Sequence, residues 1–228
     1  MLGRILSALC IILLPVVPSQ AQSKGLEQTL KRMESAGKGF QSFQAKLSQK
    51  KYTAVLGEFD APETGEFYYA RAKDGSALLR QEITEPATRI LTIKGGLATL
   101  FQPRIKTARV VNLGKNKDKA EYLALGLGQS PAKLEETFDI SYKGVETVGK
   151  TPCSILVLKP RSAAAAAYFS SITLWVGEQS GLPVQQKLEE PNGDYLLVTF
   201  SEERLNPKLP DSLFEQKLPK DVDIQRFR

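Results

Sequence analysis

Hydrophobic and polar residues along the chain follow a helical period first and a strand period afterwards. Within residues 23–36, apolar residues recur every three or four positions, which predicts a helix with one buried face. Gly37 and Gly39 are expected to end this helix. From Phe43 onward, apolar and polar residues alternate, as they do in strands with one buried and one solvated face. The pattern therefore predicts one helix followed by a β-rich body.

Strands are expected at short intervals along most of the remaining chain. They cover residues 43–48, 55–59, 65–71, 77–83, 89–94, 97–102, 107–113, 140–143, 153–159, 171–176, 182–189 and 194–202. Gly95 and Gly96 separate two of them and predict a two-residue hairpin, because such turns need positive φ angles. We therefore predict an α+β fold with one curved antiparallel sheet of about ten strands, whose concave apolar face is covered by helical segments.

The segment 120–138 is apolar but lacks the alternation of a strand. Ser130 and Pro131 have the order of an N-cap and a first helical residue, so a short helix is predicted to begin there. Gly126 and Gly128 make the preceding part bendable, and we interpret the segment as the moving part of the protein, a lid. Its candidate apolar residues are Leu123, Leu125, Leu127, Leu134 and Phe138. The alanine-rich stretch 162–170 is predicted to be either a helical turn or a linker.

One strand carries an arginine on a face that otherwise looks buried. In the stretch GEFYYAR, residues 65–71, side chains alternate, so Phe67, Tyr69 and Arg71 share one face. A guanidinium among aromatic residues is costly unless hydrogen-bond acceptors meet its five donors. The acceptors could be backbone carbonyls at a helix end, or a carboxylate at the rim such as Glu66 or Glu82.

The composition excludes several kinds of catalytic site. The chain has no histidine, which removes Ser-His-Asp and Cys-His machinery and histidine metal sites. Beyond the leader described below, Cys153 is the one cysteine, so neither an intramolecular disulfide nor a CxxC motif is expected. Cys153 opens an apolar run and is interpreted as a buried, inert thiol. Adjacent carboxylates on a strand point to opposite faces, so no catalytic pair, metal site or cofactor is predicted.

The first residues have the organisation of a secretory signal peptide. Arg4 is the positive residue, residues 5–17 form a short apolar run, and Ser19-Gln20-Ala21 provides a cleavage site. We predict removal of residues 1–21, which leaves residues 22–228 as a single domain; a retained anchor is the alternative. Cys10 lacks the context of a lipidated cysteine. Without Arg4 the chain has 30 Lys and Arg against 25 Asp and Glu, a net charge of +5 that is too diffuse to predict nucleic-acid binding.

Several stretches, in order along the chain, resemble the LolA-like family of periplasmic carriers of outer-membrane lipoproteins. They are FQSFQAKLSQ (40–49), GEFYYARA (65–72), LLRQEITEP (78–86), RILTIKGGLATLFQP (89–103), EQSGLP (178–183) and FEQKLPKDV (214–222). The chain departs from the family pattern at four positions. Ala72 stands for a proline, Thr99 for a tryptophan and Lys94 for the aspartate before the hairpin glycine, and Leu79 occupies a position that is usually aromatic.

The resemblance implies an incomplete β-barrel closed by an N-terminal helix and a central helical lid, with an apolar cavity for acyl chains. It implies that Arg71 holds the lid shut through hydrogen bonds to lid backbone carbonyls, and not through an ion pair with a rim carboxylate. The expected cavity lining follows from strand parity for Phe67 and Tyr69, which share the Arg71 face, and from the family position for Leu79; Leu91, Phe101 and Trp175 are placed on the same concave side. Ordinary core packing is the alternative reading for each of these side chains.

The resemblance further implies a monomeric periplasmic carrier without enzymatic activity. Its partners would be acylated lipoproteins, an inner-membrane transporter that releases them and an outer-membrane acceptor lipoprotein. Alternatives within the same fold are a carrier of another lipid or glycolipid and a sensor of mislocalised lipoproteins. Outside it, a secreted hydrolase would have to work without histidine, and an adhesion or scaffold module would have a filled core instead of a cavity.

Overall fold

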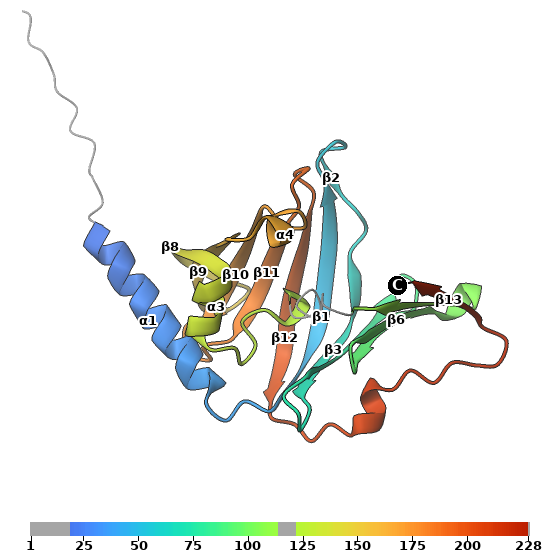
Figure 1. Cartoon of the computed structure of the whole chain (residues 1–228). Helices are drawn as coiled ribbons and strands as arrows, with labels where there is room; N and C mark the ends of the chain where they lie inside the picture. Colours follow the sequence, from blue (N-terminus) through green and yellow to red (C-terminus); the bar gives the residue numbers. More distant parts are fainter. Residues whose placement is uncertain (1–18, 114–121, 228) are drawn as a thin grey trace, which may run out of the picture.

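A computed structural model of the chain describes residues 19–113 and 122–227 (Figure 1). The helical segments are α1 (Ser19–Gly37), η1 (Pro103–Ile105), η3 (Tyr122–Ala124), α3 (Pro131–Thr137), α4 (Ala163–Ala166) and η4 (Asp211–Phe214), where η marks a 3-10 helix. The strands are β1 (Ser42–Thr53), β2 (Glu58–Phe59), β3 (Glu63–Arg71), β4 (Ala77–Glu85), β5 (Arg89–Lys94), β6 (Leu97–Gln102), β7 (Thr107–Asn112), β8 (Phe138–Val148), β9 (Thr151–Pro160), β10 (Ser171–Gly177), β11 (Pro183–Glu189), β12 (Tyr195–Leu205) and β13 (Asp223–Phe227).

The strands of the described residues form one large curved sheet. Their order is β13-β7-β6-β5-β4-β3-β1-β12-β11-β10-β9-β8, and β2 pairs with β1. Neighbouring strands are antiparallel except β13, which runs parallel to β7. The edge strands β8 and β13 lie at opposite ends of the curve, so the sheet does not close (Figure 1). The predicted fold class is confirmed, with 13 strands where about ten were expected.

Two local predictions about strands are wrong. Residues 55–59 were expected to form a strand, but only Glu58 and Phe59 pair with β1. Val55 is 89% exposed because the chain turns after Thr53 and no strand faces this tip. The other error is an omission, since the sequence did not predict β13. This strand is short and largely exposed, so it lacks the apolar alternation that marks a strand in a sequence.

The predicted turn and helix start at the centre of the chain are confirmed. Gly95 and Gly96 have φ angles of 59° and 75° and join β5 to β6, with Lys94 opposite Leu97. α3 begins at Pro131, and the Ser130 hydroxyl accepts a hydrogen bond from the backbone N–H of Lys133. This N-cap satisfies one of the donors that a helix start leaves without a partner. Local sequence signals are therefore sufficient at both places.

The concave face of the sheet carries the main hydrophobic core. Residues directly opposite each other on antiparallel strands point to the same face. The register pairs Phe43 with Tyr69, Tyr69 with Leu79 and Leu79 with Ile93, so one apolar row crosses β1, β3, β4 and β5. All four side chains are buried in a single cluster. The helix α1 packs on β8 and β9 and against α3, on the concave side of the sheet (Figure 1).

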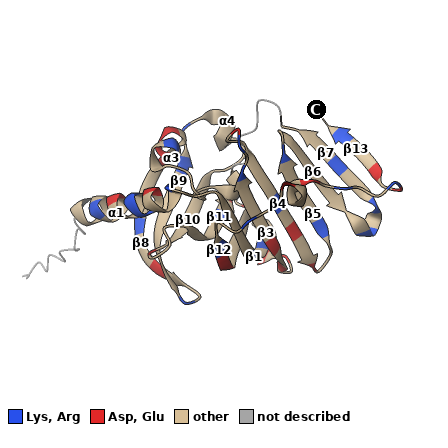
Figure 2. Ribbon diagram, turned by 90° about the horizontal axis from the view of Figure 1, so that it is seen from below, with Lys and Arg blue, Asp and Glu red and all other residues tan. Residues whose placement is uncertain are grey.

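The outer face of the sheet is partly covered by the C-terminal part of the chain. Phe214 of η4 packs on Ala70 and Leu78, which point outward from β3 and β4. Charged residues of both signs are interspersed along α1 and over the strands, and neither sign dominates the view from below (Figure 2). None of the described helices combines the length and apolar character that a bilayer span requires.

Candidate functional site

The lid segment, residues 122–138 in the described part of the chain, folds into the concave face. The side chains of Leu125, Leu127, Leu134 and Phe138 are buried in the main core. The side chain of Leu123 lies outside the described residues. In the middle of the sheet, between Leu47, Phe67 and Phe200, a space of only about 10 Å³ remains. A space of this size is about the minimum for one water molecule, so the strand side chains around it pack closely.

Two glycines allow the backbone conformation of the lid. Gly126 and Gly128 have φ angles of +81° and +63°, a region that L side chains rarely adopt. A β-carbon at Gly126 would lie 2.8 Å from the side chain of Pro183, and one at Gly128 would overlap the ring of Phe40. Both positions therefore need glycine for backbone conformation and for close packing.

Side chains from two distant strands tether the lid. Arg71, at the end of β3, donates a hydrogen bond from Nη2 to the backbone carbonyl of Gly128. Gln186, from β11, donates from Nε2 to the carbonyl of Leu125 over 2.9 Å. The two bonds hold lid residues three positions apart to strands on either side of β1 and β12. The segment thus accepts non-covalent side-chain contacts from both sides of β1 and β12.

The structure decides which acceptor Arg71 meets. The alternative partner Glu82 pairs with Arg80, with 2.7 Å between Nη2 and Oε2. Glu66 follows the opposite parity of β3, because Phe67 and Arg71 share the concave face. Arg71 also lines a pocket of about 380 Å³ between α1, the β3–β4 hairpin and the lid. It therefore stands where the lid meets solvent.

Sequence reasoning missed Gln186. The side chain is 1% exposed and lies between the buried residues Val184 and Leu188 on the inward face of β11. Burying a carboxamide without hydrogen bonds is costly, so a glutamine at an inward strand position indicates a specific partner. The alternation V-Q-Q-K-L over residues 184–188 contains that signal. It does not reveal the partner, because Leu125 is 61 residues away.

The predicted cavity residues do not all reach the concave face. Phe67, Tyr69 and Leu79 are buried there, and Leu91 is partly buried on the same face. The prediction for Phe101 is wrong, because β6 pairs it with Ile90 while Leu100 is opposite Leu91. Phe101 therefore points to the outer face. A parity error of one residue within the hairpin is enough to reverse the side.

The prediction for Trp175 is also wrong. Its neighbours Leu174 and Val176 on β10 are buried in the concave core, so Trp175 points to the outer face. There its indole Nε1 donates a hydrogen bond to the carboxylate of Glu146 over 3.0 Å. An aromatic residue in a strand is attractive as cavity lining, but its face depends on the register of the neighbouring residues.

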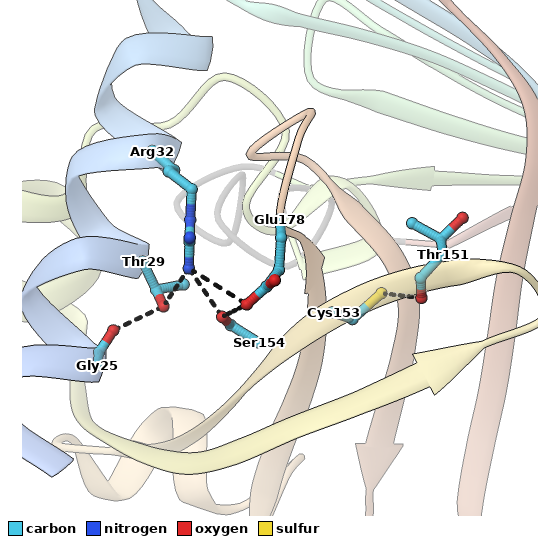
Figure 3. A network of polar contacts seen from close by, with 7 residues as sticks. All are labelled: Gly25, Thr29, Arg32, Thr151, Cys153, Ser154 and Glu178. Carbon is cyan, nitrogen blue, oxygen red and sulfur yellow. Dashed lines mark hydrogen bonds and ion pairs between the residues drawn. The ribbon is translucent and has the colours of Figure 1, made fainter. Parts of the chain in front are cut away.

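The helix α1 is fixed to the sheet by a small polar network (Figure 3). The Nη2 atom of Arg32 donates to the hydroxyl of Ser154 over 2.9 Å and to that of Thr29 over 3.3 Å. Glu178 adds a longer ion pair, with 3.9 Å between Nη2 and Oε1. Thr29 and Ser154 are fully buried, whereas the side chains of Arg32 and Glu178 are 32% and 36% exposed. The network ties α1 to β9 and to the turn after β10.

Cys153 lies beside this network and is fully buried (Figure 3). The prediction of a buried thiol is confirmed. Its sulfur donates to the backbone carbonyl of Thr151 over 3.3 Å. Burial raises the pKa of the Cys153 thiol above its ordinary value, which keeps it protonated at neutral pH.

We expect the folded protein to react slowly with a disulfide reagent such as dithionitrobenzoate. The thiolate is the reacting form, and a raised pKa and burial both reduce its availability. Release of the chromophore at pH 8 should be slow for the folded chain and fast after unfolding in guanidinium chloride, which is the control. Equal rates in both states would show that Cys153 is accessible and reactive.

The described residues contain no group of three or more Cys, Asp or Glu side chains that could hold a metal ion. The features that converge are instead a concave apolar sheet face, a segment whose apolar side chains are buried in it, and side-chain hydrogen bonds from Arg71 and Gln186 to that segment. Together they define a lidded, incomplete β-barrel, which is the architecture of a binding protein for apolar ligands.

Comparison with known families leads to the same class. The family described as outer membrane lipoprotein carrier protein LolA matches residues 38–217. The chain belongs to this family, whose members are carriers of lipoproteins or lipids. None of the curated proteins compared with the chain matches it in sequence.

Solved structures with a TM-score of at least 0.50 share the fold at low sequence identity. An uncharacterized conserved protein from Thermus thermophilus has 12% identity and a TM-score of 0.53, with 90% of this chain and 98% of that one covered. MucB has 16% identity and a TM-score of 0.50, with 91% and 66% covered. In the MucA/MucB complex of Pseudomonas aeruginosa the values are 16% and 0.46, with 86% and 60% covered. The chain thus spans about three fifths of that protein.

Proposed function

We propose that the protein is a periplasmic carrier that holds the acyl chains of lipoproteins beneath its lid and hands them to an outer-membrane acceptor. The observation that carries the proposal is the lid, which buries its apolar side chains in the concave face and accepts hydrogen bonds from Arg71 and Gln186. Membership of the LolA family supports the same cargo. An inner-membrane transporter would load the carrier, and the carrier would act as a monomer.

Burial of the lid side chains and burial of an acyl chain in the concave face contribute similar free energies. Burying one large aliphatic or aromatic side chain contributes about 1.5–3 kcal/mol, so Leu125, Leu127, Leu134 and Phe138 together contribute about 6–12 kcal/mol. An acyl chain of about 14 methylenes contributes about 11 kcal/mol at roughly 0.8 kcal/mol per methylene. One or more acyl chains can therefore replace the lid in the concave face. No nucleotide or metal is needed for the exchange itself.

The test uses a synthetic triacylated lipopeptide and the same peptide without acyl chains. The protein is mixed with each peptide in detergent, the detergent is removed, and the soluble fraction is separated by size. We expect a soluble complex with the triacylated peptide and none with the control peptide. The complex should then lose its lipopeptide to outer-membrane vesicles. A triacylated peptide that stays aggregated in the presence of the protein would contradict the proposal.

Mass spectrometry of lipids extracted from the protein in its native compartment separates this cargo from the alternatives. Lipopeptides in the extract would support the lipoprotein carrier. A defined phospholipid or glycolipid in their place would show that the same lid and concave face serve another amphiphile. That result would contradict the proposed handover to a lipoprotein acceptor but would still support a lipid-binding function.

Export is expected to produce a chain that begins at Gln22. The apolar run at residues 5–17 is too short for a comfortable bilayer span, and small residues precede the bond after Ala21. N-terminal sequencing of the protein from a periplasmic extract checks the site. A membrane-bound product that still carries residues 1–21, or one acylated at Cys10, would be incompatible with a free carrier.

Replacing Gln186 with leucine should loosen the lid without removing apolar surface. The carbonyl of Leu125 would stay buried without its partner, which costs about 1–3 kcal/mol in the closed form. Hydrogen exchange of the backbone amides of residues 124–129 should become roughly tenfold faster. The matched control is Gln185→Leu, since that glutamine donates to Thr199 on the outer face. Equal exchange in both variants would mean that Gln186 does not hold the lid.

A further inference from the structure

A second pocket lies on the concave face at the end of the strands farthest from Arg71. Its volume is about 210 Å³. Its lining combines four aliphatic and three polar side chains: Ile83, Leu91, Leu100, Leu196, Gln49, Gln81 and Arg89. Along β3 the distance from Glu63, beside this pocket, to Arg71 is eight residues, or about 26 Å. The two openings therefore lie towards opposite ends of β3.

The polar side chains of this pocket form one connected chain with Glu63. Gln81 donates from Nε2 to Oε1 of Gln49 over 2.7 Å, and Gln49 donates from Nε2 to Oε2 of Glu63 over 2.7 Å. Arg89 donates to the same carboxylate oxygen of Glu63. Gln49 is only 5% exposed. The four residues come from β1, β3, β4 and β5, and all of them point inward.

This cluster interrupts a face that is otherwise apolar. On the same strands, Leu47, Phe67 and Leu79 occupy the equivalent inward positions nearer the lid. A row of glutamines in a cavity for alkyl chains alone would reduce the binding of those chains, because covered polar groups need hydrogen-bond partners. The placement indicates a ligand that is apolar towards the lid and polar at this end.

The hydrogen-bonding capacity left in the pocket defines the polar group. Gln81 uses one amide N–H for Gln49, which leaves its second N–H and its carbonyl oxygen for a ligand. Arg89 likewise has further N–H donors besides the one given to Glu63. Glu63 and Arg89 neutralise each other, so an added anion would have to compete with Glu63 for the guanidinium. The pocket thus matches an uncharged group with both a donor and an acceptor.

We propose that this pocket binds the uncharged polar end of an amphiphile, an amide or a hydroxyl-bearing acylglycerol group, whose acyl chain extends along the concave face towards the lid. The inference rests on the proposed function and specifies the ligand of the same cavity. It assigns Gln81 and Arg89 to recognition of the polar end, and assigns Ile83, Leu91, Leu100 and Leu196 to the first part of the acyl chain.

The test compares three probes with the same fourteen-carbon chain: 1-monomyristoylglycerol, N-myristoylglycinamide and myristate. Each competes with a fluorescent fatty-acid probe for the wild-type protein. At least one neutral probe should bind about tenfold more tightly than myristate, the effect expected for about one additional satisfied hydrogen bond. Comparing the affinities of the glycerol probe and the amide probe shows which of the two neutral polar groups the pocket prefers.

Gln81→Leu should remove this preference while myristate binds within about twofold of its wild-type affinity. Gln81→Glu is a nearly isosteric second variant. It should bind myristate more weakly than the wild type does, because the new carboxylate repels the carboxylate of myristate. The matched control is Gln185→Leu, a glutamine on the outer face of β11, which should keep the wild-type order. Thermal unfolding of each variant shows whether it is folded.

The outcomes separate this inference from the function on which it rests. Equal binding of all three probes by the wild type, or an unchanged preference in folded Gln81→Leu and Gln81→Glu, would overturn the polar-end pocket and leave the acyl carrier intact. Failure of all three probes to bind the wild type would overturn the acyl carrier itself and the pocket with it.

Discussion

Arg71→Leu should free the lid from β3 and stop the handover of cargo. The variant removes the donor to the Gly128 carbonyl but keeps an apolar side chain of similar reach. The closed form should lose about 1.5 kcal/mol, the lower end of the range for a charge-assisted hydrogen bond, because the side chain is partly exposed. Backbone amides of residues 124–138 should then exchange roughly tenfold faster.

Cargo should enter this variant at least as well as the wild type, while its release should fail. Release depends on the closed, empty form being preferred, and the variant shifts the balance towards the open form. The measurement is transfer of a triacylated lipopeptide from loaded protein to outer-membrane vesicles. Arg104→Leu, at the exposed η1 turn, is the control for the loss of a positive charge. Normal transfer together with unchanged exchange would show that Arg71 has no latch role.

Gly128→Ala should have the largest effect on the lid, because it opposes closure in two ways. A non-glycine residue at a φ of +63° costs about 1–2 kcal/mol, and the added β-carbon would overlap the ring of Phe40. Overpacking of this kind typically adds about 1–3 kcal/mol. The closed form should therefore lose about 2–5 kcal/mol, and the lid should stay open for much of the time.

An open lid exposes the apolar concave face, so an apolar dye should bind Gly128→Ala more strongly than the wild type. The control is Gly149→Ala in the turn between β8 and β9. Gly149 has nearly the same φ, +62°, but an added β-carbon there would meet nothing within 4 Å. That variant should be slightly destabilised and should bind the dye like the wild type. Equal dye binding by the two variants would remove the argument that closure depends on contact with Phe40.

Arg71→Leu and Gly128→Ala each lower the stability of the closed lid, but through different interactions. Arg71 supplies a hydrogen bond at the solvent edge of the lid, whereas Gly128 permits the backbone to come close to α1 and Phe40. Gln186 contributes a third interaction, the hydrogen bond from β11 to the carbonyl of Leu125. Because these contacts and the burial of the apolar side chains are all non-covalent, cargo that buries a similar apolar area can replace the closed lid. Such a balance is what a carrier that must both accept and release its cargo requires.

Local patterns in the sequence were sufficient wherever a few neighbouring residues decide the conformation. The glycine pair of the β5–β6 hairpin needs positive φ angles, and the Ser130-Pro131 pair starts a helix in any context that allows one. Alternation predicted most strands because one face of each is buried. The absence of histidine and the single Cys153 beyond the leader also follow from the sequence alone.

Only the tertiary structure decided which face each strand presents and which distant groups meet. Phe101 and Trp175 point outward because strand register, set by pairing with neighbouring strands, determines the side of every residue in a strand. The partners Gln186 and Leu125 are 61 residues apart, and the four polar residues of the second pocket come from four strands. Residue type and spacing along the chain describe what a side chain can do, but a buried polar group acquires its role from partners that only the folded chain brings within hydrogen-bonding distance.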